Sequence, residues 1–309
     1  MATTEMEKAR PRAMIDDATD AERRSRSVGI LLMCGALVCF ACLDASGKWL
    51  SHHVPVWQVV WSRYLGATVL VLAFINPWTT ERMFATTRPV IQTIRACLLF
   101  GSTAFNFFAL RKLQLTETMA IQFAMPLLVS LLAGPILGEW VGARRLAAIC
   151  VGFIGVLVVL RPGAGAVDPA AGFAVAGLFC YAFYSMLTRL LASSDPSRTT
   201  TLFSAMSGVV FLTPFVPFFW VWPQDWLVWL LLCGCGFFGG FGHWLLILAH
   251  SRAPAAVLAP FVYTQIVWAT GFGYFVFGDI PGPFTMVGAL IVVASGLYLF
   301  ARDRVRRGA

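Results

Sequence analysis

The sequence predicts an all-α membrane protein of ten transmembrane helices, arranged as two inverted five-helix repeats with both chain ends in the cytoplasm. Three observations carry this prediction: the composition, a series of long apolar runs, and an internal repeat. Of the 309 residues, 59% are hydrophobic and 12% are charged, whereas a soluble domain carries roughly a quarter charged residues. One soluble core cannot hide so much apolar surface, so the composition excludes a water-soluble fold.

The apolar runs are continuous and roughly 20 residues long, which is the length that a helix needs to cross the hydrocarbon core. Only helices and closed barrels satisfy all backbone hydrogen bonds in a bilayer, and a barrel would need alternating apolar and polar residues. Turn residues such as Asn76-Pro77 and Pro281-Gly282-Pro283 separate the runs. The ten candidate spans lie near residues 28–50, 55–75, 89–110, 116–137, 143–161, 169–191, 199–221, 226–249, 254–277 and 283–301.

The net charge of +8 comes from basic residues that cluster between the spans, which indicates topology and not a nucleic-acid partner. With a cytoplasmic N-terminus, the inner loops and tails hold 17 of the 23 Lys and Arg residues, and the outer loops hold four. This bias predicts that both termini are cytoplasmic. Residues 1–27 carry many charges of both signs and no aromatic residue, which predicts a disordered tail; residues 303–309 form a short basic tail.

The two halves of the chain match each other at an offset of 140 to 141 residues. Cys-Phe-Ala at 39–41 matches Cys-Tyr-Ala at 180–182, and Gly138-Glu139 matches Gly278-Asp279. One offset that holds along the whole chain defines two units, residues 28–161 and 169–302. Because each unit has five spans, the second must insert upside down relative to the first. Inverted repeats of this kind are typical of secondary carriers, whose solute sits between the repeats near the midplane.

The chain resembles the ten-helix EamA-domain members of the drug/metabolite transporter superfamily over residues 28–302. The residues that carry the resemblance are Trp61-Ser-Arg63-Tyr, Ala124-Met-Pro126 and Gly138-Glu139, with a weaker echo at Pro260 and Gly278-Asp279. The resemblance implies a multi-pass protein of the bacterial inner membrane that carries a small-molecule solute. It is strongest to alphaproteobacterial members, which include riboflavin and S-adenosylmethionine uptake carriers.

Charged residues inside a span are costly, so each needs a partner or a water-filled cavity. Asp44 and Arg63 lie at similar depths, about 9 to 12 Å below the outer surface at 1.5 Å per helical residue. In the functional interpretation, Asp44 binds a proton or the cationic part of a solute. In the structural interpretation, the two side chains form a fixed ion pair between neighbouring helices. The residues alone leave both interpretations open.

The other polar residues of the spans are candidate cavity residues. Arg95, Ser102 and Asn106 recur at helical spacing on one face, and Arg95 is near enough to the cytoplasmic end to snorkel instead. Pro126 and Pro260 break the fourth and ninth spans, which predicts a hinge or a cavity-lining kink. Glu139 and Asp279 end these spans and are predicted to latch the gates. Further candidates for lining the cavity are Gln122, Tyr181, Tyr184, Ser185, His243, Trp244, Tyr263 and Gln265.

The function predicted from these features is secondary active transport by alternating access, with riboflavin as the favoured solute. Export or import of amino acids or related metabolites such as S-adenosylmethionine is the alternative. The chain lacks the motifs of an enzyme, and a channel fits its proline breaks less well. All eight cysteines lie in apolar spans and behave as small hydrophobes, so neither a metal nor a cofactor is predicted. The residues leave open whether transport is coupled to protons. They also leave open whether the carrier is a monomer or a homodimer.

Overall fold

The fold is known from a computed structural model, which describes residues 2–74, 84–138, 142–161, 168–191 and 194–307. Within these ranges every regular element is helical. The first half of the chain contains α1 (Ala2–Leu50), α2 (Val56–Phe74), α3 (Pro89–Leu110), α4 (Leu115–Gln122), α5 (Met125–Leu137) and α6 (Ala143–Leu160). The second half contains α7 (Pro169–Leu191), α8 (Ser197–Leu212), the 3-10 turn η1 (Thr213–Phe215), α9 (Val216–Phe219), α10 (Trp226–Arg252), α11 (Ala255–Val262), α12 (Gln265–Phe277) and α13 (Pro283–Arg307).

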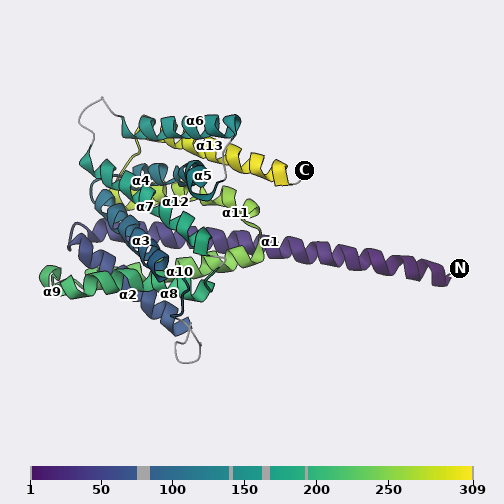
Figure 1. The fold of residues 1–309 in the computed structure, drawn as a ribbon, viewed down its shortest axis with the longest axis horizontal. Coiled ribbons are helices and arrows are strands. Elements are labelled where there is room, and N and C mark those ends of the chain that lie inside the picture. Colours follow the sequence, from purple (N-terminus) through teal and green to yellow (C-terminus); the bar gives the residue numbers. More distant parts are fainter. Residues whose placement is uncertain (1, 75–83, 139–141, 162–167, 192–193, 308–309) are drawn as a thin grey trace.

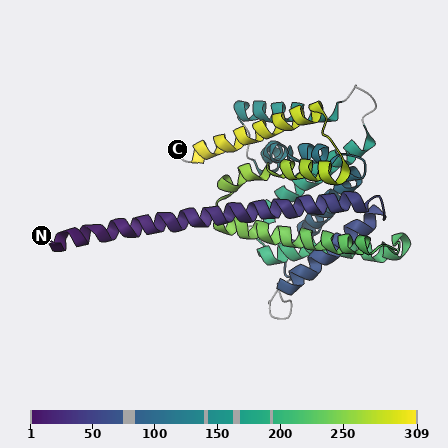
Figure 2. The same cartoon turned by 180° about the vertical axis from the view of Figure 1, so that it is seen from behind.

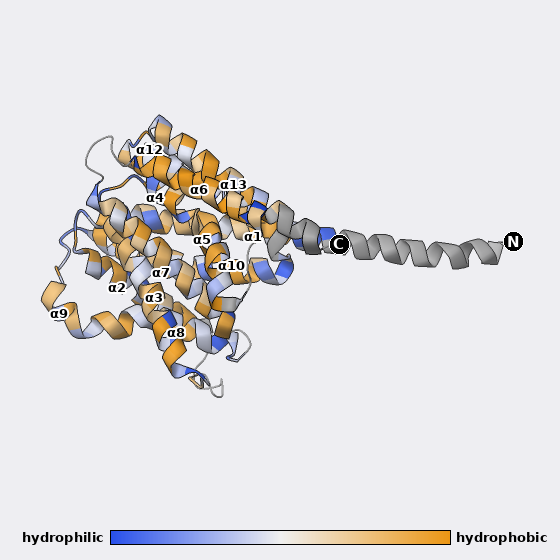
Figure 3. Cartoon of the chain, turned by 45° about the horizontal axis from the view of Figure 1, so that its top comes forward, coloured by the Kyte–Doolittle hydropathy of each residue, from blue (hydrophilic) through white to orange (hydrophobic). Residues whose placement is uncertain are grey.

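Eight helical stretches of the described chain are long and apolar enough to cross a membrane. They cover the first eight predicted spans, and α4 and α5 together make one of them, Leu115–Ile136. A shorter apolar helix, Pro283–Leu299, lies in the tenth predicted span, while the ninth is divided between α11 and α12. Figure 3 shows hydrophobic residues along the lengths of these helices and hydrophilic residues near their ends. The chain is therefore a multi-pass membrane protein.

Helix α1 extends far beyond the bundle at its N-terminal end (Figure 1). The structure has residues 2–22 in this helical extension, where the composition predicts a disordered tail. Ala, Glu, Arg and Lys, which are good helix formers, together make up 11 of these 21 residues. It also continues an existing helix, so that it needs no new helical nucleus.

The strongest helix packing joins the two halves of the chain. Helix α1 packs against α10, and α3 packs against α7. If each span is replaced by its counterpart in the other half of the chain, the first of these pairs becomes the second. Helices α6 and α13, which are counterparts, pack against each other, and so do α2 and α8. Figures 1 and 2 show α6 and α13 side by side at one edge of the bundle, and both chain ends on the same side.

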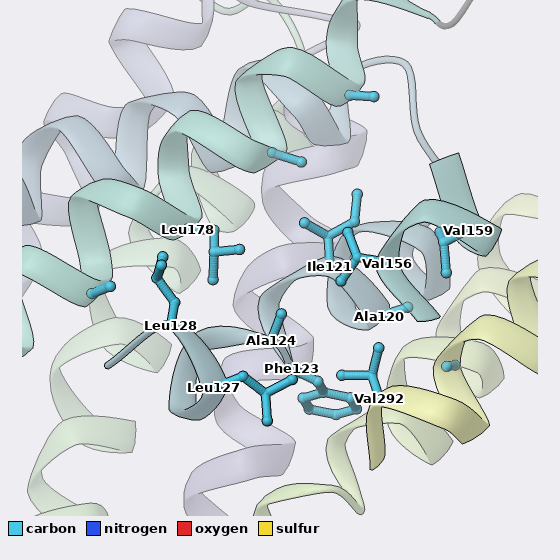
Figure 4. Packing of buried hydrophobic residues seen from close by; sticks show 14 of the residues in the cluster. Ala120, Ile121, Phe123, Ala124, Leu127, Leu128, Val156, Val159, Leu178 and Val292 are labelled. Atoms are coloured by element: carbon cyan, nitrogen blue, oxygen red, sulfur yellow. The ribbon is translucent and has the colours of Figure 1, made fainter. Parts of the chain in front are cut away.

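Close packing at these crossings depends on small residues and on a continuous apolar core. A Cβ built on Gly66 of α2 would lie 2.5 Å from the Cα of Gly236 on α10, so neither position has room for a side chain. Near α6 and α13, the side chains of Ile121, Leu127 and Val292 are completely buried and belong to one cluster (Figure 4). The bundle is thus held together by contacts between residues that are far apart in the sequence.

Two helix breaks occupy corresponding places in the two halves. Helix α4 ends at Gln122 and α5 begins at Met125; helix α11 ends at Val262 and α12 begins at Gln265. Hydrogen bonds of the tight 3-10 type cross each break, from Ala124 N to Ile121 O and from Thr264 N to Phe261 O. Beyond each break, α5 and α12 end at a glycine in the left-handed conformation, Gly138 at φ 74° and Gly278 at φ 69°.

Candidate functional site

A cavity of about 180 Å³ lies inside the bundle, enclosed by α1, α2, α3, α4, α7, α10 and α12. Its apolar wall includes the rings of Phe40 and Phe107. Eight of the residues predicted from the sequence line this central cavity: Asp44, Arg63, Ser102, Asn106, Gln122, Tyr181, His243 and Gln265. The two helix breaks place Gln122 and Gln265 there, since one ends α4 and the other begins α12.

The two charged residues of the central cavity are each held by a side chain of α3. Asn106 donates from Nδ2 to Asp44 Oδ1 at 3.1 Å, and Arg63 donates from Nη1 to Thr103 Oγ1 at 3.0 Å. Thr103 gives its own hydroxyl hydrogen to the carbonyl oxygen of Leu99. The Tyr64 hydroxyl, 3.0 Å from Thr103 Oγ1, must therefore donate to it, which fills both lone pairs of Thr103.

Asp44 and Arg63 do not form a direct ion pair within the described part of the chain, although both line the same cavity. Asp44 is only 8% exposed, and a buried charge is costly without a partner. Arg63 Nε and Asn106 Oδ1 are also buried and have no hydrogen-bond partner among the described protein atoms. The cavity therefore presents a carboxylate, a guanidinium and an amide oxygen that can still bind further polar groups. The fixed ion pair of the structural interpretation is not what this geometry shows.

A second cavity of about 300 Å³ adjoins the central one and shares Arg63, Leu99 and His243 with it. It extends past Tyr184 on α7 to Ser197, where α8 begins. Helix α1 runs from the side of the termini to the far side of the bundle, and α2 returns from there. When the later helices are followed in the same way, α8 begins at the side of the termini, so this second cavity lies toward that side. Together the two cavities reach the several hundred Å³ that are typical of sites for metabolites.

The second cavity is braced by Arg95, whose side chain is completely buried and does not snorkel to the surface. Its Nε donates to Gln92, its Nη1 donates to Thr188 of α7, and its Nη2 donates to Thr200 O and Ser204 Oγ of α8 at 2.6 and 2.7 Å. These bonds use the planar fork of the guanidinium to tie α3 to α7 and α8. Arg95 is thus a structural anchor at the wall of the cavity.

Asp195, in the connection between α7 and α8, completes this brace. Its carboxylate accepts hydrogen bonds from the hydroxyls of Thr86 and Thr87, from Thr87 N and from Gln92 Nε2. Burial alone would raise the pKa of Asp195, but these hydrogen bonds outweigh it and hold the pKa below its ordinary value of 3.8. Asp195 is therefore ionised at neutral pH and fixes the start of α3 against the end of α7.

The remaining sequence candidates lie elsewhere, and neither of the two cavities includes them. Tyr263 is buried at the break between α11 and α12, where its ring packs edge-on against Phe123. Trp244 is 38% exposed on α10 with its ring 5.5 Å from that of Phe241, and Ser185 is half-buried on α7. Of the predicted gate residues, Asp279 binds Lys48, while Glu139 lies outside the described residues.

Sequence reasoning did not identify Thr103, Asp195 and Ser204, although each positions a charged side chain. Hydroxyl residues are common in membrane helices, so Thr103 gives no signal by itself. Asp195 follows a predicted span directly and looks like an ordinary loop acid. The packing of α3 against α7 and α8, which joins residues about 100 positions apart, reveals the roles of Asp195 and Ser204, and the bond from Arg63 of α2 reveals that of Thr103.

Comparison with known proteins gives the family and the fold. The sequence model of the EamA-like transporter family matches residues 27–161 and 169–301. A protein of Rickettsia prowazekii named "S-adenosylmethionine uptake transporter" is 25% identical over 277 residues, which cover 89% of this chain and 93% of that protein. A protein of Vibrio cholerae named "Riboflavin transporter" is 26% identical over 278 residues, which cover 88% of this chain and 92% of that protein.

A solved crystal structure shares the fold with a TM-score of 0.62 and 18% sequence identity, over 91% of this chain and 98% of its own. The family and its relatives are transporters, which confirms the prediction of a transport protein and not an enzyme. The family match covers both halves of the chain and agrees with the resemblance seen in the sequence. The chain belongs to the EamA-like transporter family.

Proposed function

We propose that this protein is a secondary active transporter of the bacterial inner membrane that takes up a zwitterionic metabolite of the S-adenosylmethionine type. The observation that carries the proposal is the presence of Asp44 and Arg63 on one cavity without a direct ion pair. S-adenosylmethionine carries an ammonium and a sulfonium beside a carboxylate. Asp44 binds the cationic groups, and Arg63 binds the carboxylate through charge-assisted hydrogen bonds.

Aromatic side chains on the same cavity suit the adenine ring of such a solute. Tyr181, Phe40 and Phe107 line the central cavity and offer faces and edges for stacking. Four relatives from Rickettsia species, at 24 or 25% identity, are also named for S-adenosylmethionine uptake. This identity is low enough for the solute to differ, so the charges of the site are the main support for the proposal.

Riboflavin is the second candidate, and it is the solute that the sequence alone favours. The aromatic lining and the relatives of Vibrio cholerae and Brucella anthropi that are named riboflavin transporters support it. Riboflavin, however, is uncharged at neutral pH and would leave Asp44 and Arg63 without charged partners. We therefore place it second.

The proposed architecture has ten spans in two inverted units, residues 28–161 and 169–302. Helices α11 and α12 form the ninth span and α13 forms the tenth. Both termini are cytoplasmic, so that the second cavity faces the cytoplasm and the Lys48–Asp279 contact lies at the outer side. The exchange of packing partners between the halves supports alternating access by this route.

The experiment that tests the proposed solute is uptake into proteoliposomes that contain the purified protein. Labelled S-adenosylmethionine and labelled riboflavin are compared, each with an excess of the other as competitor. Saturable uptake of S-adenosylmethionine that riboflavin does not inhibit is the expected result. Saturable uptake of riboflavin alone would reverse the ranking, and uptake of neither would reject both solutes.

A further inference from the structure

Lys48 of α1 crosses to the other half of the chain and contacts Asp279, which follows the end of α12. The distance from Lys48 Nζ to Asp279 Oδ2 is 2.5 Å, and the two side chains are only 9% and 25% exposed. The ammonium also lies 4.7 Å from the centre of the Phe277 ring, within the range of a cation–π interaction. The pair is therefore largely shielded from water.

This contact lies at the end of the bundle away from the termini, where further bonds join the two halves. Thr116 of α4 and Thr270 of α12 are 3.2 Å apart at their hydroxyl oxygens, and Gln114 reaches the carbonyl oxygen of Ile280 at 3.4 Å. These three contacts join the two halves across this end of the bundle. In a carrier that opens here by separating its halves, Lys48 parts from Asp279.

The surroundings of Lys48 favour a second acid when Asp279 moves away. Burial lowers the pKa of nearby His52, and the positive charges of Arg111 and Lys48 lower it further. Basic side chains therefore gather around Lys48 at this point of the bundle. A partly buried ammonium gains from a counter-charge, so a carboxylate within reach of Lys48 would stabilise the open state.

Asp44 is placed to be that carboxylate. It precedes Lys48 by four residues on α1, so that both side chains lie on one helix face with Cβ atoms about 5 to 6 Å apart. An acid four residues before a base is also the favourable order for such a pair. Both residues are buried, at 8% and 7% exposure, and Asp44 is the carboxylate of the central cavity.

We propose that Lys48 is a positioning residue that exchanges between Asp279 and Asp44, and so couples solute binding to closure of this end of the bundle. The proposal rests on the proposed function, in which Asp44 binds the cationic part of the solute. In the empty carrier, Lys48 binds Asp44 when the end is open and Asp279 when it is closed. A bound solute cation occupies Asp44, which leaves Asp279 as the acid for Lys48. Solute therefore favours the closed end, and by reciprocity closure tightens solute binding.

The test measures access to the closure in full-length protein that has been freed of its native cysteines. Thr116→Cys places a reporter at the closure, outside both cavities, and a membrane-impermeant maleimide is added from that side. With Lys48 present, saturating S-adenosylmethionine slows alkylation at least fivefold. In Lys48→Gln, alkylation is fast, and the solute changes its rate less than twofold. Lys48→Arg restores the response to solute, and the exposed Lys112→Gln is the matched control that keeps it.

A charge exchange separates the coupling role from a static ion pair. In Lys48→Asp with Asp279→Lys, the outer pair forms again, so alkylation is slow in the absence of solute. Asp at position 48 cannot bind Asp44, so the solute no longer slows alkylation further. A normal fivefold response in this double variant, or in Lys48→Gln, would overturn the proposal.

Binding of labelled S-adenosylmethionine to each purified variant distinguishes the two proposals. Wild-type protein that binds and transports the solute, yet shows no change in Thr116→Cys alkylation, overturns the coupling alone. Wild-type protein that does not bind S-adenosylmethionine overturns the proposed solute, and the coupling with it. Variants that still bind the solute are folded, so loss of the alkylation response in them supports the coupling.

Discussion

Asp44 and Arg63 bring opposite charges to one cavity, and the side chains of α3 keep them from neutralising each other. Asn106 donates one hydrogen bond to Asp44, and Thr103 accepts one from Arg63. Asp44 and Arg63 each keep further capacity to bind a ligand. Arg63 Nε and Asn106 Oδ1 are buried without a protein partner, and such atoms are rare in folded proteins unless they bind a ligand or water. The arrangement favours a solute with charges of both signs.

Substitution of these charges should reduce transport without removing the protein from the membrane. Asp44→Asn keeps the size of the side chain, Arg63→Gln shortens it, and each substitution removes a charge, so we expect uptake to fall at least tenfold in kcat/KM. Ser185→Ala, on a residue that lines neither cavity, serves as the control and should change uptake less than twofold. Uptake and membrane abundance are measured together. An equal fall in both quantities would indicate that the charges act in folding.

Asp195 should stabilise the protein to the same extent at all pH values near neutrality. Its pKa is below 3.8, so its stabilising effect is fully present above that ordinary value and is lost as the pH falls through the lower, folded value. Asp195→Asn removes the charge from four hydrogen bonds, which should cost about 1 to 3 kcal/mol. Thermal unfolding of both proteins in detergent at about pH 5 and pH 8 should show the same difference in midpoint. A difference that shrinks at pH 5 would mean that Asp195 titrates much higher.

Helices α2 and α10 approach each other closely because two glycines face each other at the crossing. A Cβ on Gly236 would lie 2.6 Å from the Cα of Gly66, against backbone that cannot rotate away. Gly236→Ala should therefore push the helices apart and cost roughly 1 to 3 kcal/mol of stability. Gly172→Ala on α7 is the matched control, because a Cβ there meets no atom within 4 Å. Melting temperature and membrane abundance measure the effect; equal values for the two variants would contradict this account.

The helix breaks show how far sequence patterns predict elements. Both spans that contain a candidate hinge proline are divided in the structure, but the prolines lie differently: Pro126 is in the first turn of α5, just after its break, whereas Pro260 is inside α11, before its break. The break residues Gln122 and Gln265 reach the central cavity, but Tyr263 packs into the core. Composition cannot separate these outcomes, because a tyrosine in a span suits either a cavity wall or a packed core. Whether the breaks act as hinges remains a prediction.

At the scale of the whole molecule, the sequence predicts the spans well and the contacts between them poorly. Apolar length indicates where a helix can cross the bilayer, and at the first eight predicted spans the structure has helical stretches that are long and apolar enough to do so. Which helices meet depends on ridges, grooves and small residues on surfaces far apart in the chain. The pairing of α1 with α10 and of α3 with α7 therefore had no signal in the composition. The position of Asp279 opposite Lys48 depends on a further contact of this kind, between α1 and α12.

The proposed topology makes opposite predictions for two loops. Gln224, in the connection before α10, should face the outside, and Arg198, at the start of α8, should face the cytoplasm. In protein freed of its native cysteines, an impermeant maleimide added to intact cells should label Gln224→Cys at once. It should label Arg198→Cys only after the cells are opened. The reverse pattern would place the termini outside. Labelling of both cysteines in intact cells would mean that the chain does not cross the membrane an odd number of times between positions 198 and 224.

The packing between the halves has a consequence for how the protein is made. When the ribosome has finished α6, the most extensive contacts of α1, α2 and α3 are still missing, because α7, α8 and α10 supply them. At roughly 5 to 20 residues per second, the further stretch to the end of α10 takes about 5 to 20 seconds. During that interval the nascent first half holds Lys48 and Arg95 in the membrane without their partners from the second half. Newly inserted spans must therefore wait beside the insertion machinery or a membrane chaperone, and a stalled ribosome in the second half would leave a fragment marked for degradation by its exposed charges.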